Sequence, residues 1–78
     1  MDYSESDLPV TLKETETLTL ADGTTVRFEE SGGARDVMIG DEWSPRTTLF
    51  PGSDYMLDAG GKQYKLTAGG DDLTIELA

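Results

Sequence analysis

The sequence contains no cysteine and no histidine, and only six lysines and arginines stand against sixteen aspartates and glutamates. The absence of cysteine and histidine removes the thiol nucleophile, the commonest general base and the preferred zinc ligands. It also excludes a disulfide-framed secreted module. Ser31, Ser44 and Ser53 have no histidine to activate them, so a Ser-His-Asp catalytic centre is excluded as well.

Long apolar runs are also missing, since no stretch of about 18 apolar residues occurs anywhere in the chain. Residues 1–7 are acidic and lack the basic and apolar regions of a signal peptide. These features predict a cytoplasmic protein that makes no membrane contact. Hydrophobic residues make up 36% of the 78 residues and aromatic residues 8%, so we expect one small core.

The net charge of −10 indicates which partners suit the chain. A compact body of this charge is repelled by nucleic acid and by anionic lipid, and it is attracted to basic surfaces. We therefore expect no direct binding to nucleic acid. The expected partner is a basic protein surface, such as that of a nucleic-acid-binding protein. The oligomeric state does not follow from charge.

Alternating apolar and polar residues, separated by glycine-containing turns, predict an all-β chain. No segment shows a sustained helical period, and the ten threonines disfavour helix. Residues 1–9 are expected to form a flexible acidic arm. Residues 10–78 are expected to form a single β-domain.

The first predicted hairpin joins residues 15–20 to residues 25–29. A three-residue loop in which Gly23 is left-handed would place Leu18 opposite Val26 on the apolar face. A two-residue turn would set apolar residues against polar ones across the ladder. The three-residue loop is therefore predicted.

The C-terminal part of the chain predicts a three-stranded antiparallel meander over residues 55–59, 62–68 and 72–77. Turns at 60–61 and 69–72 both give registers that bring the apolar residues onto one face. The residues expected to face inward are Tyr55, Leu57, Tyr64, Leu66, Ile75 and Leu77.

Two further short strands are expected at 36–39 and 46–50. The fold is thus expected to contain six or seven short strands, arranged as a small antiparallel β-barrel or as a two-sheet sandwich. The barrel is preferred, because closure would hide the sheet edges of so short a chain.

Three pairs of adjacent acids are candidates for chemistry. Acid–base catalysis needs two carboxylates roughly 5–9 Å apart across a cleft, whereas neighbours along a strand point to opposite faces. A calcium loop needs several oxygen ligands, and the spacing around Asp71 and Asp72 departs from glycine-aspartate calcium repeats. We therefore expect no enzyme activity, no metal and no cofactor. The pairs are Glu29-Glu30, Asp41-Glu42 and Asp71-Asp72.

Residues 41–46 form the most distinctive predicted loop, because they contain the only tryptophan, Trp43, after two acids and before a Pro-Arg pair. An exposed tryptophan beside charged residues is typical of an interface hot spot. The alternative is that Trp43 folds back and covers one end of the core, because tryptophan is highly buried on average.

The leading hypothesis is a non-catalytic acidic protein that docks on a basic site of another macromolecule. Small inhibitors from phages and mobile elements, such as anti-CRISPR and nucleic-acid-mimic proteins, are similar in size and charge. The alternative is a halophile-adapted structural or accessory β-module, whose charge keeps it hydrated. The residues expected to contact the partner are Asp41, Glu42, Trp43, Glu29, Glu30, Asp71 and Asp72.

Overall fold

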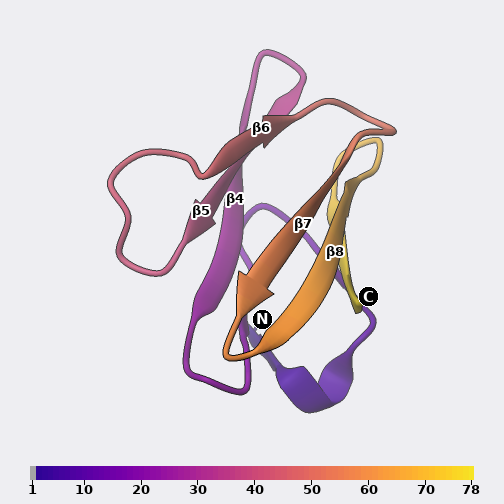
Figure 1. The fold of residues 1–78 in the computed structure, drawn as a ribbon. Coiled ribbons are helices and arrows are strands. Elements are labelled where there is room, and N and C mark those ends of the chain that lie inside the picture. Colours follow the sequence, from indigo (N-terminus) through magenta and orange to yellow (C-terminus); the bar gives the residue numbers. More distant parts are fainter. Residues whose placement is uncertain (1) are drawn as a thin grey trace.

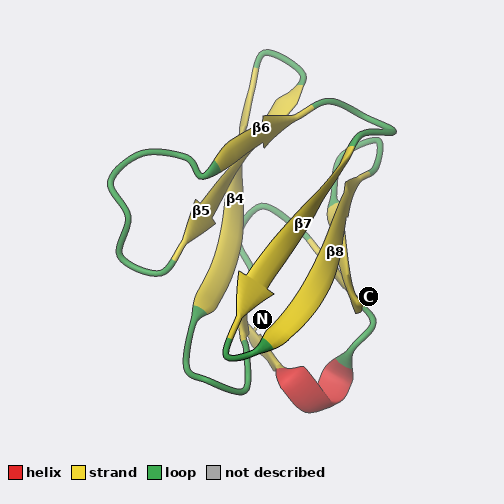
Figure 2. Ribbon diagram, in the orientation of Figure 1, coloured by secondary structure: helices red, strands yellow, loops and turns green. Residues whose placement is uncertain are grey.

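The computed structural model describes residues 2–78, which form two β-sheets and one short 3-10 helix, η1 (Glu5–Asp7) (Figures 1 and 2). The first sheet has the spatial order β1 (Asp2–Ser4), β3 (Thr17–Thr19), β4 (Thr25–Ser31), β5 (Ala34–Ile39) and β6 (Thr47–Leu49). The second has the order β2 (Val10–Leu12), β9 (Leu73–Leu77), β8 (Lys62–Ala68) and β7 (Asp54–Ala59). No helix within this range is long and apolar enough to cross a membrane.

The all-β prediction is confirmed, and two separate hydrogen-bonded sheets correspond to the sandwich alternative rather than to the preferred barrel. The strands number nine over residues 2–78, two more than the largest predicted number. The additional strands are β1 and β2, each three residues long. Such short segments offer too few positions for an alternating pattern to be recognised.

The arm predicted over residues 1–9 includes Met1, which lies outside the described residues; within the rest of it, β1 and Glu5 are bonded to the remainder of the fold. β1 pairs in parallel with β3, and η1 follows it. The Glu5 carboxylate accepts a hydrogen bond from the Ala21 N–H at 2.9 Å and another from the Tyr64 hydroxyl at 2.8 Å. The N-terminal segment therefore contacts both sheets.

The first hairpin has the predicted register. Leu18 lies opposite Val26, and the Leu20 N–H donates to the Thr24 carbonyl at 2.8 Å. Gly23 has a φ of 90°, the left-handed conformation that this loop requires. The three-residue loop is therefore confirmed.

The C-terminal meander also has its predicted register in both hairpins. Leu57, Leu66 and Ile75 are buried, and Tyr55 is partly buried against the core. Leu77 is an error of the prediction, because its side chain is 52% exposed. It lies beyond Ile75, the last residue of β9 that pairs with β2, so no neighbouring strand covers it on that side.

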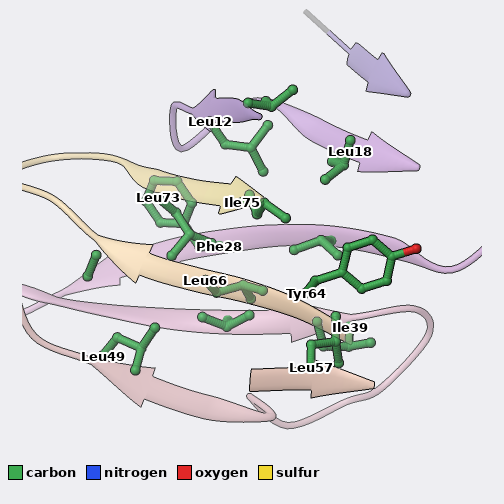
Figure 3. Packing of buried hydrophobic residues seen from close by; sticks show 14 of the residues in the cluster. Leu12, Leu18, Phe28, Ile39, Leu49, Leu57, Tyr64, Leu66, Leu73 and Ile75 are labelled. Atoms are coloured by element: carbon green, nitrogen blue, oxygen red, sulfur yellow. The ribbon is translucent and has the colours of Figure 1, made fainter. Parts of the chain in front are cut away.

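Side chains from both sheets meet in one hydrophobic core (Figure 3). Leu18 and Phe28 come from the first sheet, and Leu57, Leu66 and Ile75 come from the second. Each of these five side chains is at most 1% exposed. Because this core is complete without Trp43, the 40–46 loop is free to project away from it.

The turn between β7 and β8 consists of Gly60 and Gly61, with φ values of 59° and 78°. Both values are unfavourable for residues with a side chain. A Cβ atom on Gly60 would also lie 2.8 Å from the Cβ of Asp22, in the turn between β3 and β4. The β7–β8 turn of the second sheet therefore contacts the β3–β4 turn of the first sheet, at the end of the sandwich where η1 lies.

Candidate functional site

The loop between β5 and β6, residues 40–46, projects from the side of the sandwich (Figure 1). We call it the Trp43 loop. The Trp43 side chain is 99% exposed, so it does not cover the core. The Gly40 N–H donates to the Thr25 carbonyl at 2.8 Å, and the Arg46 N–H donates to the Val37 carbonyl at 2.7 Å. These bonds attach both ends of the loop to the first sheet.

A side-chain brace joins the two arms of the Trp43 loop. The Glu42 carboxylate accepts hydrogen bonds from Nε and Nη2 of Arg46. The hydrogen bond from Arg46 lowers the pKa of Glu42, although partial burial opposes that shift. The hydrogen bonds that Arg46 donates to Glu42, followed by its interaction with Tyr55, raise the pKa of Arg46. Trp43 is thus presented from a loop that is already fixed.

A second group of residues surrounds Arg35, where the β4–β5 turn lies near the β8–β9 turn. Its side chain is only 1% exposed, and its Nη1 donates to the Gly33 carbonyl at 2.8 Å. Nη2 donates to the carbonyls of Gly69 and Gly70 in the turn between β8 and β9. The Glu30 carboxylate lies 3.9 Å from Nη1. The guanidinium therefore holds β4, β5 and this turn together.

Three further acids extend the group around Arg35. Lys13 lies 3.7 Å from Asp71 and 3.8 Å from Asp72. The Glu14 carboxylate accepts a hydrogen bond from the Glu30 N–H at 3.0 Å. We call Glu14, Glu30, Asp71 and Asp72 the acidic end. Three of these residues were predicted from the sequence, and Glu14 was not.

The Trp43 loop and the acidic end lie at opposite ends of the β4–β5 hairpin. Val26 pairs with Ile39 near the loop, and Glu30 pairs with Arg35 near the acidic end. At about 3.3 Å per residue, the two ends are roughly 15 Å apart along the strand. Six of the seven predicted contact residues are therefore divided between these two places.

Glu29 belongs to neither place, since it lies on the outer side of β4 and forms an ion pair with Arg27 at 3.0 Å. Every basic residue of the chain is held in the same way, within ion-pair distance of an acid. Each basic side chain is therefore offset by a neighbouring acid, and the net charge of −10 comes from the acids in excess. The six basic residues are Lys13, Arg27, Arg35, Arg46, Lys62 and Lys65.

Glu5 forms a network that sequence reasoning did not find. Burial opposes the charge of its carboxylate, but hydrogen bonds from Tyr64, the Ala21 N–H and Lys62 together lower its pKa. Burial and the bond to Glu5 raise the pKa of Tyr64 to about 12, so the hydroxyl remains a donor. No sequence pattern points to Glu5.

Arg35, in contrast, has the same period of two along β5 as two apolar residues of that strand. This pattern could have placed the Arg35 side chain on the inner face of the sheet.

Over residues 2–78 the surface has no pocket, and no group of three or more acids is arranged to hold a metal ion. The features that point to a function are therefore the exposed Trp43 and the distribution of charge. Comparisons of the chain with known protein families, curated proteins and solved structures give no match.

Proposed function

We propose that the protein is a non-catalytic binding protein whose Trp43 loop anchors it on a basic surface of another macromolecule. The observation that carries this proposal is the Trp43 side chain, which is 99% exposed. Burying a tryptophan removes roughly 150–250 Å² from water, which at about 25 cal/mol per Å² corresponds to about 4–6 kcal/mol at most. None of this stabilises the free protein, so the whole gain belongs to a complex.

The negative charge of the chain determines which kind of partner surface the Trp43 loop prefers. Asp41 and Glu42 precede Trp43, and the net charge of the chain is −10. A negative body attracts a basic surface over long range and speeds association. A standard interface covers about 800 Å² per partner, which is wide compared with the roughly 15 Å that separates the Trp43 loop from the acidic end along β4.

In its specific form, the proposal is that the acidic surface occupies a groove in which the partner otherwise binds DNA or RNA. The protein would then act as an inhibitor of the anti-CRISPR or nucleic-acid-mimic type. Its net charge supports this form, because a groove that binds phosphates attracts any body of similar charge. Competition by duplex DNA for the captured partner tests it directly.

The experiment is an affinity pull-down that compares three immobilised proteins as bait: wild type, Trp43→Ala and Phe50→Ala. Phe50 is a matched control, because it is 59% exposed and follows β6, whereas the Trp43 loop precedes that strand. Wild type and Phe50→Ala are expected to retain the same basic protein, and Trp43→Ala to bind it about 30-fold more weakly, as loss of a 2 kcal/mol hot spot requires. Equal retention by Trp43→Ala would contradict the proposal.

Salt separates this function from the halophilic alternative. A binding protein folds well at low salt, and its complex weakens as salt rises. A halophile-adapted module gains stability toward molar salt, because screening reduces repulsion among its acids. A melting temperature that rises steeply with salt, together with no retained partner, would favour the alternative.

A further inference from the structure

The two sheets have four edges, and one of them differs from the rest. β1, β2 and β6 are three residues long, whereas the edge strand β7 has six residues. An edge strand has backbone N–H and C=O groups without a partner on its outer side, so it is a template for another strand. β7 is the edge with room for several such bonds.

The Gly60-Gly61 turn determines which groups of β7 are available. In a two-residue hairpin the residues that flank the turn, here Ala59 and Lys62, form a hydrogen-bonded pair, and bonded pairs then alternate along the ladder. The Ala68 N–H donates to the Ser53 carbonyl at 3.0 Å, as this alternation requires. Tyr55, Leu57 and Ala59 are therefore bonded to β8, and the backbone groups of Asp54, Met56 and Asp58 face the open edge.

The same three residues have exposed side chains, arranged as an acid, an apolar residue and an acid. Met56 is 42% exposed, and Asp54 lies 3.8 Å from Lys65 on the neighbouring strand. A strand added to β7 would place its own side chains directly opposite these positions. Their chemistry therefore selects what can pair with the edge.

A second copy of the chain is a poor occupant. Antiparallel pairing of two β7 strands about Met56 would place Asp54 opposite Asp58 twice, and like charges directly opposite one another are destabilising. Each copy also has a net charge of −10. Opposite charges at the same positions would instead stabilise the pair.

We propose that β7 takes up an extended segment of a partner protein as an additional antiparallel strand of the second sheet. The segment has a basic residue, any residue, an apolar residue, any residue and a basic residue, so that its cations lie opposite Asp54 and Asp58 and its apolar side chain opposite Met56. Trp43 lies in the loop between β5 and β6 and not on β7, so substitutions at Trp43 and at β7 test the two proposals separately.

The test uses two synthetic peptides, acetyl-Thr-Lys-Thr-Val-Thr-Lys-Thr-amide and the same peptide with glutamate in place of both lysines. Each is titrated into the labelled protein, and NMR follows the amide shifts and amide hydrogen exchange. The lysine peptide is expected to shift and protect the amides of Asp54, Met56 and Asp58. The glutamate peptide is expected to bind about tenfold more weakly. Equal binding of the two peptides would overturn the proposal.

Two variants at one position separate edge pairing from simple charge attraction. Met56→Pro removes an outward N–H without removing a bond to β8, and proline is tolerated at such edge positions. Met56→Thr keeps that N–H. Only Met56→Pro is expected to lose binding of the lysine peptide, and unchanged binding by folded Met56→Pro would overturn the proposal.

If Met56→Pro does not fold, the double variant Asp54→Lys/Asp58→Lys replaces it. This variant is expected to prefer the glutamate peptide, and a retained preference for lysine would count against strand addition. Trp43→Ala is expected to bind the lysine peptide as wild type does. Loss of that binding in Trp43→Ala would assign the peptide to the Trp43 loop and overturn the assignment to β7.

Discussion

Replacing Arg35 by methionine tests how much the buried guanidinium contributes to stability. Methionine keeps most of the apolar volume and removes the hydrogen bonds to the carbonyls of Gly33, Gly69 and Gly70. A hydrogen bond to a charged group contributes about 1.5–3 kcal/mol. The carbonyls lie in turns at the surface, where water can replace the lost donors, and replacement of a buried charge by an apolar residue is often nearly neutral. We therefore expect a net loss of about 1.5 kcal/mol for Arg35→Met.

Arg35→Ala is the matched comparison, because it removes the same bonds and also leaves a cavity. Truncation of a large buried side chain to alanine costs about 2–5 kcal/mol, and we expect a total of about 4 kcal/mol. A chain of this size has a total stability of roughly 4–12 kcal/mol, so the alanine variant should be close to unfolding. The methionine variant should remain well folded.

Urea unfolding followed by circular dichroism measures both variants. With a slope of about 1 kcal/mol per molar urea, Arg35→Met should lower the midpoint by about 1.5 M. A midpoint equal to that of wild type would refute the claim that these bonds stabilise the fold. Equal losses for methionine and alanine would refute the claim that packing accounts for the difference.

Three other tests, which use five substitutions, address the described contacts. Glu5→Gln should lower the melting temperature at pH 7, and the difference from wild type should disappear in acid. Because the pKa of Glu5 is lowered in the folded protein, the stability that the Glu5 carboxylate contributes is complete above its ordinary pKa of 4.5. That stability is lost as pH falls through the lower pKa of the folded state. A difference that persists at the lowest pH would argue against the network. Gly60→Ala should destabilise the protein more than Gly61→Ala, because only at Gly60 does an added Cβ meet another residue; equal urea midpoints would contradict this. Leu66→Ala should cost about 2–5 kcal/mol and Leu77→Ala less than about 1 kcal/mol, since Leu66 is fully buried and Leu77 is half exposed; similar losses would contradict the burial of the meander.

The registers of the hairpins could be predicted from local sequence. Gly23 and the Gly60-Gly61 pair determine the loop types, and a shift by one residue would have exposed Leu18 or Leu57. The long-range strand pairings could not be predicted in this way, because no turn residue in the sequence indicates them. The parallel pairing of β1 with β3 joins segments that share no turn, and it involves only three residues of each strand.

The candidate site was predictable in composition but not in geometry. Trp43 and the acidic pairs are distinctive in the sequence. Hydrophobicity nevertheless favours burial of tryptophan, and only the structure shows Trp43 exposed. The separation of the Trp43 loop from the acidic end follows from the pairing of β4 with β5. Nothing local to Asp41 or Asp71 indicates that separation.

Fluorescence of the single tryptophan tests the central claim most directly. In the free protein Trp43 should emit as a water-exposed indole and be fully quenched by acrylamide, since its side chain is 99% exposed. Addition of the captured basic partner should move the emission to shorter wavelength and protect the indole from acrylamide. A partner that binds tightly while emission and quenching stay unchanged would contradict the claim that Trp43 is the anchor.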